Sequence, residues 1–63
     1  MFEEYPDLLN IDELSEAMRM GKTKCYSLLS KREIKGYRDG RDWRIPKYSV
    51  VDYVMKKSGL PLR

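Results

Sequence analysis

Histidine is absent from this 63-residue sequence, and cysteine occurs once, at Cys25. Histidines and clustered cysteines are the usual ligands of structural zinc, so we expect no such metal site. A lone cysteine cannot form an intramolecular disulfide, which suits a reducing compartment, and we predict that Cys25 is a small buried apolar residue. The same shortages remove most nucleophilic and histidine-based catalysis, and no acid–base pair suits a catalytic pocket. We therefore predict a protein without enzymatic activity, cofactor or metal.

Long apolar runs are also missing. No segment approaches the ~20 apolar residues of a membrane-spanning helix, and the N-terminal Met-Phe-Glu-Glu lacks the basic start of a signal peptide. We expect a cytoplasmic protein that makes no membrane contact. Its length allows one domain at most and leaves little room for a deep cavity. The apolar fraction of 41% nevertheless predicts a folded domain and not a disordered chain.

Charged residues are plentiful but unevenly distributed. Residues 1–17 hold six acidic and no basic residues, whereas the remaining 46 hold thirteen basic and four acidic ones, for a net charge of +3. An acidic arm before a basic body indicates a polyanionic partner, such as nucleic acid, for the body. The alternative is that the basic residues form an ordinary solvated surface. The arm is predicted to be loose, either solvated or in contact with a neighbouring molecule.

Residues 10–20 predict a short helix. Asn10 has the character of an N-cap, with Glu13 three positions on as its capping-box partner. An apolar stripe follows at Ile11, Leu14, Ala17 and Met18. Gly21 ends this pattern, permits a tight turn, and can cap the start of another helix.

The next segment, KTKCYSLLSK, predicts a second helix with two contrasting faces. Apolar residues stand at Cys25, Leu28 and Leu29, which indicates the buried side. The opposite face carries the hydroxyl groups of Thr23, Tyr26, Ser27 and Ser30, flanked by Lys22, Lys24 and Lys31. Two short helices joined by a glycine-containing turn of about three residues are what a helix-turn-helix requires, although any small helical bundle has such turns.

The stretch GYRDGRDWRIP combines arginines with a tryptophan, which predicts a hairpin that is apolar at its base and basic at its tip. Asp39-Gly40 is a strong signal for a two-residue turn. Centring a hairpin there gives three pairs on one face, namely Ile34 with Ile45, Gly36 with Trp43, and Arg38 with Arg41. We predict a wing that Trp43 and Ile45 anchor in the core. Its two tip arginines, side by side, would accommodate a phosphate between them.

A third helix is predicted after Pro46, because proline suits the first turn of a helix. Its buried side comprises Val50, Val51, Tyr53 and Val54. Gly59 and Pro61 are expected to end it. The predicted fold class is a small α+β winged helix-turn-helix, in which a β-hairpin wing and a C-terminal helix follow the two helices. This domain spans residues 9–58, between an acidic arm at 1–8 and a tail at 59–63.

The run from Leu9 to Val54 resembles the small winged helix-turn-helix domains of the excisionase type, relatives of the DNA-binding domain of MerR regulators. The resemblance lies in NIDELSEAM, TKCYSLLSK and GRDWRIPKYSVVDYV, and covers about three-quarters of the chain. Its most specific element is the wing pattern Gly40-Arg41-x-Trp43-Arg44-Ile45. The sequence departs from the family at Arg32, where Gly is frequent, at Lys35, where Pro is frequent, and at Asp42, a usually basic place.

The resemblance implies that the second helix enters the major groove of double-stranded DNA while the wing contacts the backbone or the adjacent minor groove. The residues facing DNA would be Lys22, Thr23, Lys24, Tyr26 and Ser27 from the helix, and Arg38, Arg41 and Arg44 from the wing. Hydroxyl and lysine groups reach phosphates and base edges, and arginines suit phosphates or a narrow minor groove. Tyr26 is alternatively a half-buried core aromatic.

The resemblance also implies a function, namely an architectural protein that binds and bends DNA beside a tyrosine or serine integrase to promote excision of a mobile element. Cooperative self-association on adjacent DNA sites is expected for so small a domain. A small transcriptional regulator and a DNA-binding domain of phage packaging proteins would share this fold, and an adaptor for acidic proteins is an alternative of another class. Without room for the coiled coil and effector domain of MerR regulators, no small-molecule ligand is expected.

Overall fold

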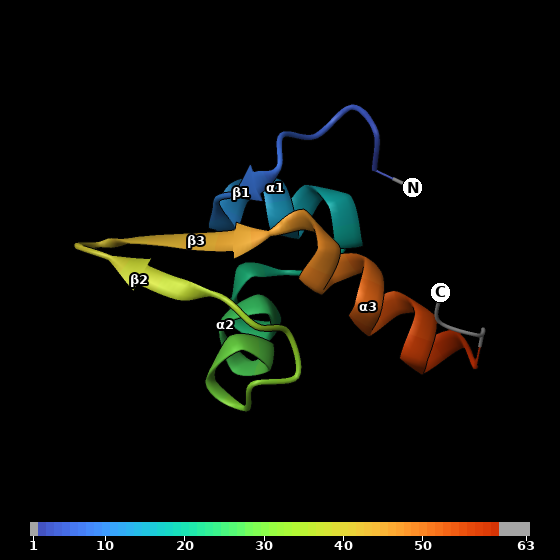
Figure 1. The fold of residues 1–63 in the computed structure, drawn as a ribbon. Helices are drawn as coiled ribbons and strands as arrows, with labels where there is room; N and C mark the ends of the chain where they lie inside the picture. The colour runs from blue at the N-terminus through green and yellow to red at the C-terminus, as the bar shows by residue number, and fades with distance from the viewer. Residues whose placement is uncertain (1, 60–63) are drawn as a thin grey trace.

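The structure, a computed structural model, describes residues 2–59, and its elements follow the order of a winged helix-turn-helix (Figure 1). In chain order they are β1 (Leu8–Leu9), α1 (Ile11–Met18), α2 (Lys22–Ser30), β2 (Tyr37–Asp39), β3 (Asp42–Pro46) and α3 (Lys47–Ser58). The predicted α+β class, with a wing between the second and third helices, is therefore confirmed. No helix in this part of the chain is long and apolar enough to cross a membrane.

Helix α1 begins with the predicted capping box. The side-chain oxygen of Asn10 accepts a hydrogen bond from the backbone N–H of Glu13 at 2.8 Å, and the Glu13 carboxylate accepts one from the backbone N–H of Asn10 at 2.9 Å. These two bonds satisfy donors that a helix start otherwise leaves unpaired. The helix is capped at its end by Arg19, in the left-handed conformation with φ of 56°, and Gly21 is the N-cap of α2. The predicted tight turn between the helices is thus present.

The sheet has three antiparallel strands in the order β1-β3-β2, so β3 is its central strand. Strand β1 is not among the elements predicted from the sequence. Its two residues pair with the end of β3, Leu8 opposite Pro46 and Leu9 opposite Ile45. A strand of this length has no alternation of apolar and polar residues to detect.

The turn of the β2–β3 hairpin lies one residue later than predicted. The observed pairs are Tyr37 with Arg44, Arg38 with Trp43, and Asp39 with Asp42. Gly40 and Arg41 are therefore the turn residues. Gly40 has a positive φ of 67°, and Arg41 is not among the described residues with positive φ. A glycine in the first of two turn positions is typical of a type II′ turn, whereas the Asp39-Gly40 prediction assumed type I′.

The observed register changes which residues lie next to Gly36. The predicted pairing of Gly36 with Trp43 is wrong, because Trp43 lies opposite Arg38. A β-carbon built at Gly36 would lie 3.1 Å from Ile45 Cγ1 and 3.3 Å from Leu29 Cδ2. The base of the hairpin therefore packs closely against the core and α2 at Gly36.

The core lies between the helices and the sheet. Its buried apolar residues are Leu9, Leu14, Cys25, Leu28, Leu29, Ile34, Ile45 and Val50. Trp43 is partly buried and packs against this cluster, so it anchors the wing without being fully enclosed. Burial raises the pKa of the Cys25 thiol, which favours the neutral form expected of a small apolar core residue.

The described part of the N-terminal arm is packed against the domain and is not loose as predicted. Lys47, the first residue of α3, donates its backbone N–H to the Asp7 carbonyl at 2.7 Å and its ammonium to the Tyr5 carbonyl at 3.0 Å. The Tyr5 hydroxyl donates to the Glu16 carboxylate at 3.1 Å. These bonds join residues that are distant in the sequence, so no local sequence pattern predicts them.

Helix α3 begins directly after β3 and is capped at its end by Gly59 with φ of 72°, as predicted. Pro46 is its N-cap and the last residue of β3, one position before the first turn in which it was predicted. Pro61, the other residue predicted to end the helix, lies outside the described residues. On the predicted buried side, Val50 is fully buried and the partly buried residues are Val51, Tyr53 and Val54.

Replacement of the central core residue Ile45 by alanine is expected to unfold the domain. Ile45 has 0% exposure on the central strand, and truncating a buried isoleucine costs about 2–5 kcal/mol, comparable to the whole stability of a small domain. Thermal melts followed by circular dichroism check this. Tyr48→Ala is the control, because a side chain with 77% exposure should shift the midpoint by only about 2–4 °C. A wild-type midpoint for Ile45→Ala would contradict this description of the core.

Candidate nucleic-acid interface

Helix α2 turns its polar side to solvent because its apolar side is buried. Cys25, Leu28 and Leu29 are all in the core. The side that faces solvent carries the exposed Thr23, Lys24 and Tyr26 and the partly buried Ser27, with the exposed Lys22 at the helix start. Tyr26, with 45% exposure, lies on the surface and not in the core. All five residues predicted from this helix are thus available on one element.

Lys22 is ion-paired within the protein. Its Nζ lies 2.6 Å from Oδ1 of Asp12 on α1. The hydrogen bond and the charge of Asp12 raise the pKa of Lys22, which therefore stays protonated at physiological pH. Both side chains are mostly exposed, so the pair adds little to stability. A phosphate that binds Lys22 has to compete with Asp12.

The three wing arginines do not form one cluster. Arg38 lies over the ring of Trp43, with its guanidinium carbon 5.8 Å from the ring centroid, a cation–π geometry. Arg41 occupies the turn, and Arg44 lies on the opposite face of the hairpin with its Nε 3.5 Å from Oδ2 of Asp39. The prediction that Arg38 and Arg41 stand opposite each other is wrong, because the register pairs Arg38 with Trp43.

Arg38 belongs to the face of the wing on the side of α2. Side chains alternate along a strand, so Arg38 shares its face with Gly36, and that face approaches Leu29 of α2. Arg44 points to the other face. Figure 1 shows the hairpin projecting beyond the helices, with β2 on the α2 side of β3. The structure therefore brings Arg38 to the same side as α2 and leaves Arg44 on the other.

Two cations that the sequence analysis did not assign to the site, Arg32 and Lys35, lie between α2 and the wing. They line a hollow whose other lining residues are Leu29, Ser30, Ile34, Gly36 and Trp43. Both are exposed. The sequence did hold one signal for these two residues. Arg32 and Lys35 stand where the resembling family frequently has glycine and proline.

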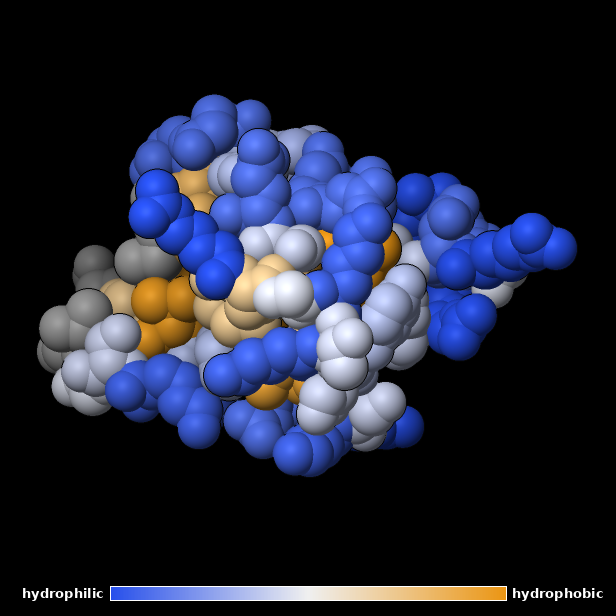
Figure 2. Space-filling model, turned by 180° about the vertical axis from the view of Figure 1, so that it is seen from behind, coloured by the Kyte–Doolittle hydropathy of each residue, from blue (hydrophilic) through white to orange (hydrophobic). Residues whose placement is uncertain are grey.

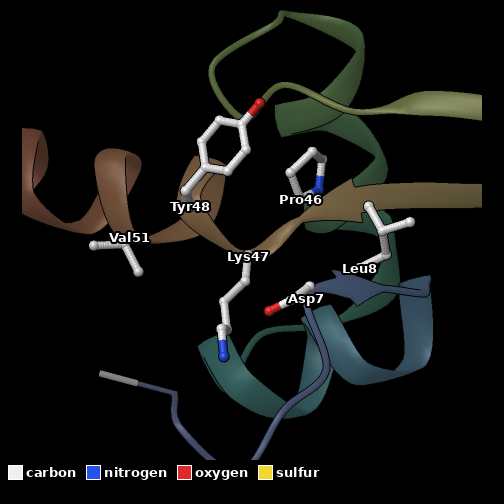
Figure 3. A pocket seen from close by; sticks show the side chains of 6 residues that line it. All are labelled: Asp7, Leu8, Pro46, Lys47, Tyr48 and Val51. Carbon is white, nitrogen blue, oxygen red and sulfur yellow. The ribbon is translucent and has the colours of Figure 1, made fainter.

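Another hollow lies between β1 and the start of α3 and has a different chemistry. Leu8, Pro46, Tyr48 and Val51 give it an apolar lining, with Asp7 and Lys47 beside them (Figure 3). From behind, the projecting end of the molecule is covered by hydrophilic side chains, and apolar surface gathers away from it (Figure 2). A polyanion is therefore expected to contact α2 and the wing, and not this apolar hollow.

Comparison with known proteins agrees with this arrangement. Residues 8–58 match the model of a family described as helix-turn-helix domain. The chain is also 37% identical over 49 residues to a probable excisionase from Saccharopolyspora erythraea, in an alignment that covers 78% of this chain and 50% of that protein. The chain thus spans about half the length of this curated relative. No solved structure matches the chain significantly.

Proposed function

The chain belongs to the helix-turn-helix domain family and is an excisionase-like DNA-binding protein, and from this premise we propose that it binds and bends double-stranded DNA to promote integrase-mediated excision of a mobile element. The observation that carries the proposal is a solvent-facing α2 next to a basic wing, on a domain that matches the family over residues 8–58. The excision role rests on the similarity to a protein named as a probable excisionase.

In this proposal α2 enters the major groove, which is wide enough to admit a helix. Thr23, Tyr26 and Ser27 offer hydroxyl groups to base edges from the solvent side of the helix. Lys22 and Lys24 flank them and contact phosphates, which fixes the position of the helix without reading sequence.

The wing contacts the adjacent backbone or minor groove. Arg38 faces the same side as α2, and Arg41 projects from the turn, so both reach phosphates beside the groove that α2 occupies. Arg44 lies on the other face with Asp39. In this proposal the wing enters the minor groove, where both faces of the hairpin meet the DNA backbone. Arg44 contacts the DNA from the second of these faces.

The proposal also covers the protein partners and the location in the cell. A tyrosine or serine integrase is the protein partner, and copies of the chain associate cooperatively on adjacent DNA sites. The relationship to the DNA-binding domain of MerR regulators and the cytoplasmic location are part of it. The chain performs no chemistry of its own and takes no small-molecule ligand, because its contribution is to the shape of the DNA.

Duplex binding is expected to depend steeply on salt. If about four to six phosphates are neutralised, the slope of log affinity against log salt concentration is roughly −4 to −5. Fluorescence anisotropy titrations at several NaCl concentrations measure it. A salt-independent affinity, or no binding to any duplex at low salt, contradicts DNA binding and favours the protein-adaptor alternative.

Removing side chains from α2 is expected to change DNA binding differently from removing side chains from the wing. A Thr23→Ala/Ser27→Ala double variant loses base contacts worth about 1–3 kcal/mol each and should lose preference for the native site over a scrambled duplex. Arg38→Ala loses a phosphate contact and should weaken binding to both duplexes alike. Parallel titrations at one salt concentration give the comparison. If the double variant kept its full preference, α2 would not be the element that reads sequence.

Bending separates the architectural role from that of a simple DNA-binding regulator. A duplex with a donor and an acceptor dye at its two ends should show increased energy transfer when the protein binds its site, because bending brings the ends together. A scrambled duplex of equal length is the control. Saturated binding without any change in energy transfer would contradict the excisionase-type role and leave DNA binding itself intact.

A further inference from the structure

The hollow between the end of α2 and strand β2 has no role in the interface described so far. We propose that it binds one sugar–phosphate unit of the DNA backbone through Arg32 and Lys35. This inference rests on the proposed DNA binding and extends the interface across the space between the helix and the wing.

The charge of the hollow suits an anion. None of its seven lining residues is acidic, and within residues 2–59 no carboxylate lies at ion-pair distance from Arg32 or Lys35. The acidic residue between them in the sequence, Glu33, lies 3.7 Å from Nζ of Lys57 on α3. Arg32 and Lys35 also line a neighbouring hollow that contains Glu33 and Asp52. Each of these carboxylates has a lysine of α3 as its ion-pair partner, so Arg32 and Lys35 remain available to a phosphate.

The apolar part of the lining suits a sugar. Trp43 is partly buried and forms part of the hollow with Leu29 and Ile34. Gly36 also lines the hollow, and its backbone packs closely against Ile45 and Leu29. Leu29 and Ile34 are buried, so the apolar surface offered here comes mainly from Trp43. A cationic rim beside a partly buried aromatic ring fits a phosphate and the deoxyribose attached to it.

The backbone conformation at Arg32 allows the role of its side chain to be separated from that of the turn. Its φ of 62° lies in the left-handed region, which glycine adopts more readily than arginine. The turn is held there because the backbone N–H groups of Glu33 and Ile34 both donate to the Leu28 carbonyl, at 2.9 and 3.3 Å. Glycine would satisfy this turn without strain. Arg19, at the end of α1, has the same left-handed conformation with φ of 56°, so the conformation alone does not indicate a ligand. It fixes the point at which the exposed Arg32 side chain leaves the turn.

Two substitutions at this position separate the side chain from the backbone. Arg32→Gln removes the charge and keeps the strain, whereas Arg32→Gly removes both. Both should weaken binding to a 20-base-pair duplex of random sequence by about three- to tenfold and reduce the salt slope by about one. Only Arg32→Gly should raise the melting midpoint, by about 2–6 °C. Lys35→Gln should match Arg32→Gln in affinity and salt slope.

Lys56→Gln is the matched control, because Lys56 is an exposed cation of α3, paired with Asp52 at 3.3 Å, that lines the neighbouring hollow and not this one, whereas Arg32 and Lys35 line both. It should lose less than twofold in affinity. Wild-type affinity for both Arg32→Gln and Lys35→Gln would overturn the assignment, as would an equal loss in Lys56→Gln, which would place the phosphate in the neighbouring hollow. If the wild-type protein bound no duplex at all, the proposed function itself would fail, a result distinct from either of these.

Discussion

The close approach of Gly36 to Ile45 and Leu29 holds the wing in a defined position relative to α2. A β-carbon at Gly36 would come within 3.1 Å of Ile45 Cγ1 and 3.3 Å of Leu29 Cδ2, so a side chain there would require these neighbours to shift. Ile45 belongs to the central strand, which also pairs with β1 and leads directly into α3. The two elements proposed to contact DNA are therefore set by one packed junction in a small core.

Ion pairs and unpaired cations lie on both sides of the same junction. The acidic N-terminal part supplies Asp12 to Lys22, and the wing supplies its own Asp39 to Arg44. These exposed pairs contribute little to stability, but they lower the free positive charge at the helix start and on the far face of the wing. The cations without a carboxylate partner in the described chain include Arg32 and Lys35, between the helix and the wing. Arg32 and Lys35 thus add positive charge between the two elements.

Features with a local cause could be predicted from the sequence, and those with a tertiary cause could not. The Asn10–Glu13 capping box and the Gly59 cap depend on a few adjacent residues, so residue type alone indicates them. The hairpin register was missed because two glycine-containing turns, centred one residue apart, both fit the local sequence. The packing of Lys47 on the N-terminal arm and the hollow at Arg32 depend on distant contacts, which no periodic pattern records.

Amide chemical-shift perturbation on titration with a DNA duplex tests the central claim, that α2 and the wing form one DNA-binding surface, more directly than any single variant. The account predicts that the largest changes fall on residues 22–27 of α2, on 32–36 between the elements, and on 38–41 of the wing. Residues 5–9 and the apolar hollow beside α3 should change little. Perturbations centred on that N-terminal face, with α2 and the wing unaffected, would contradict the account.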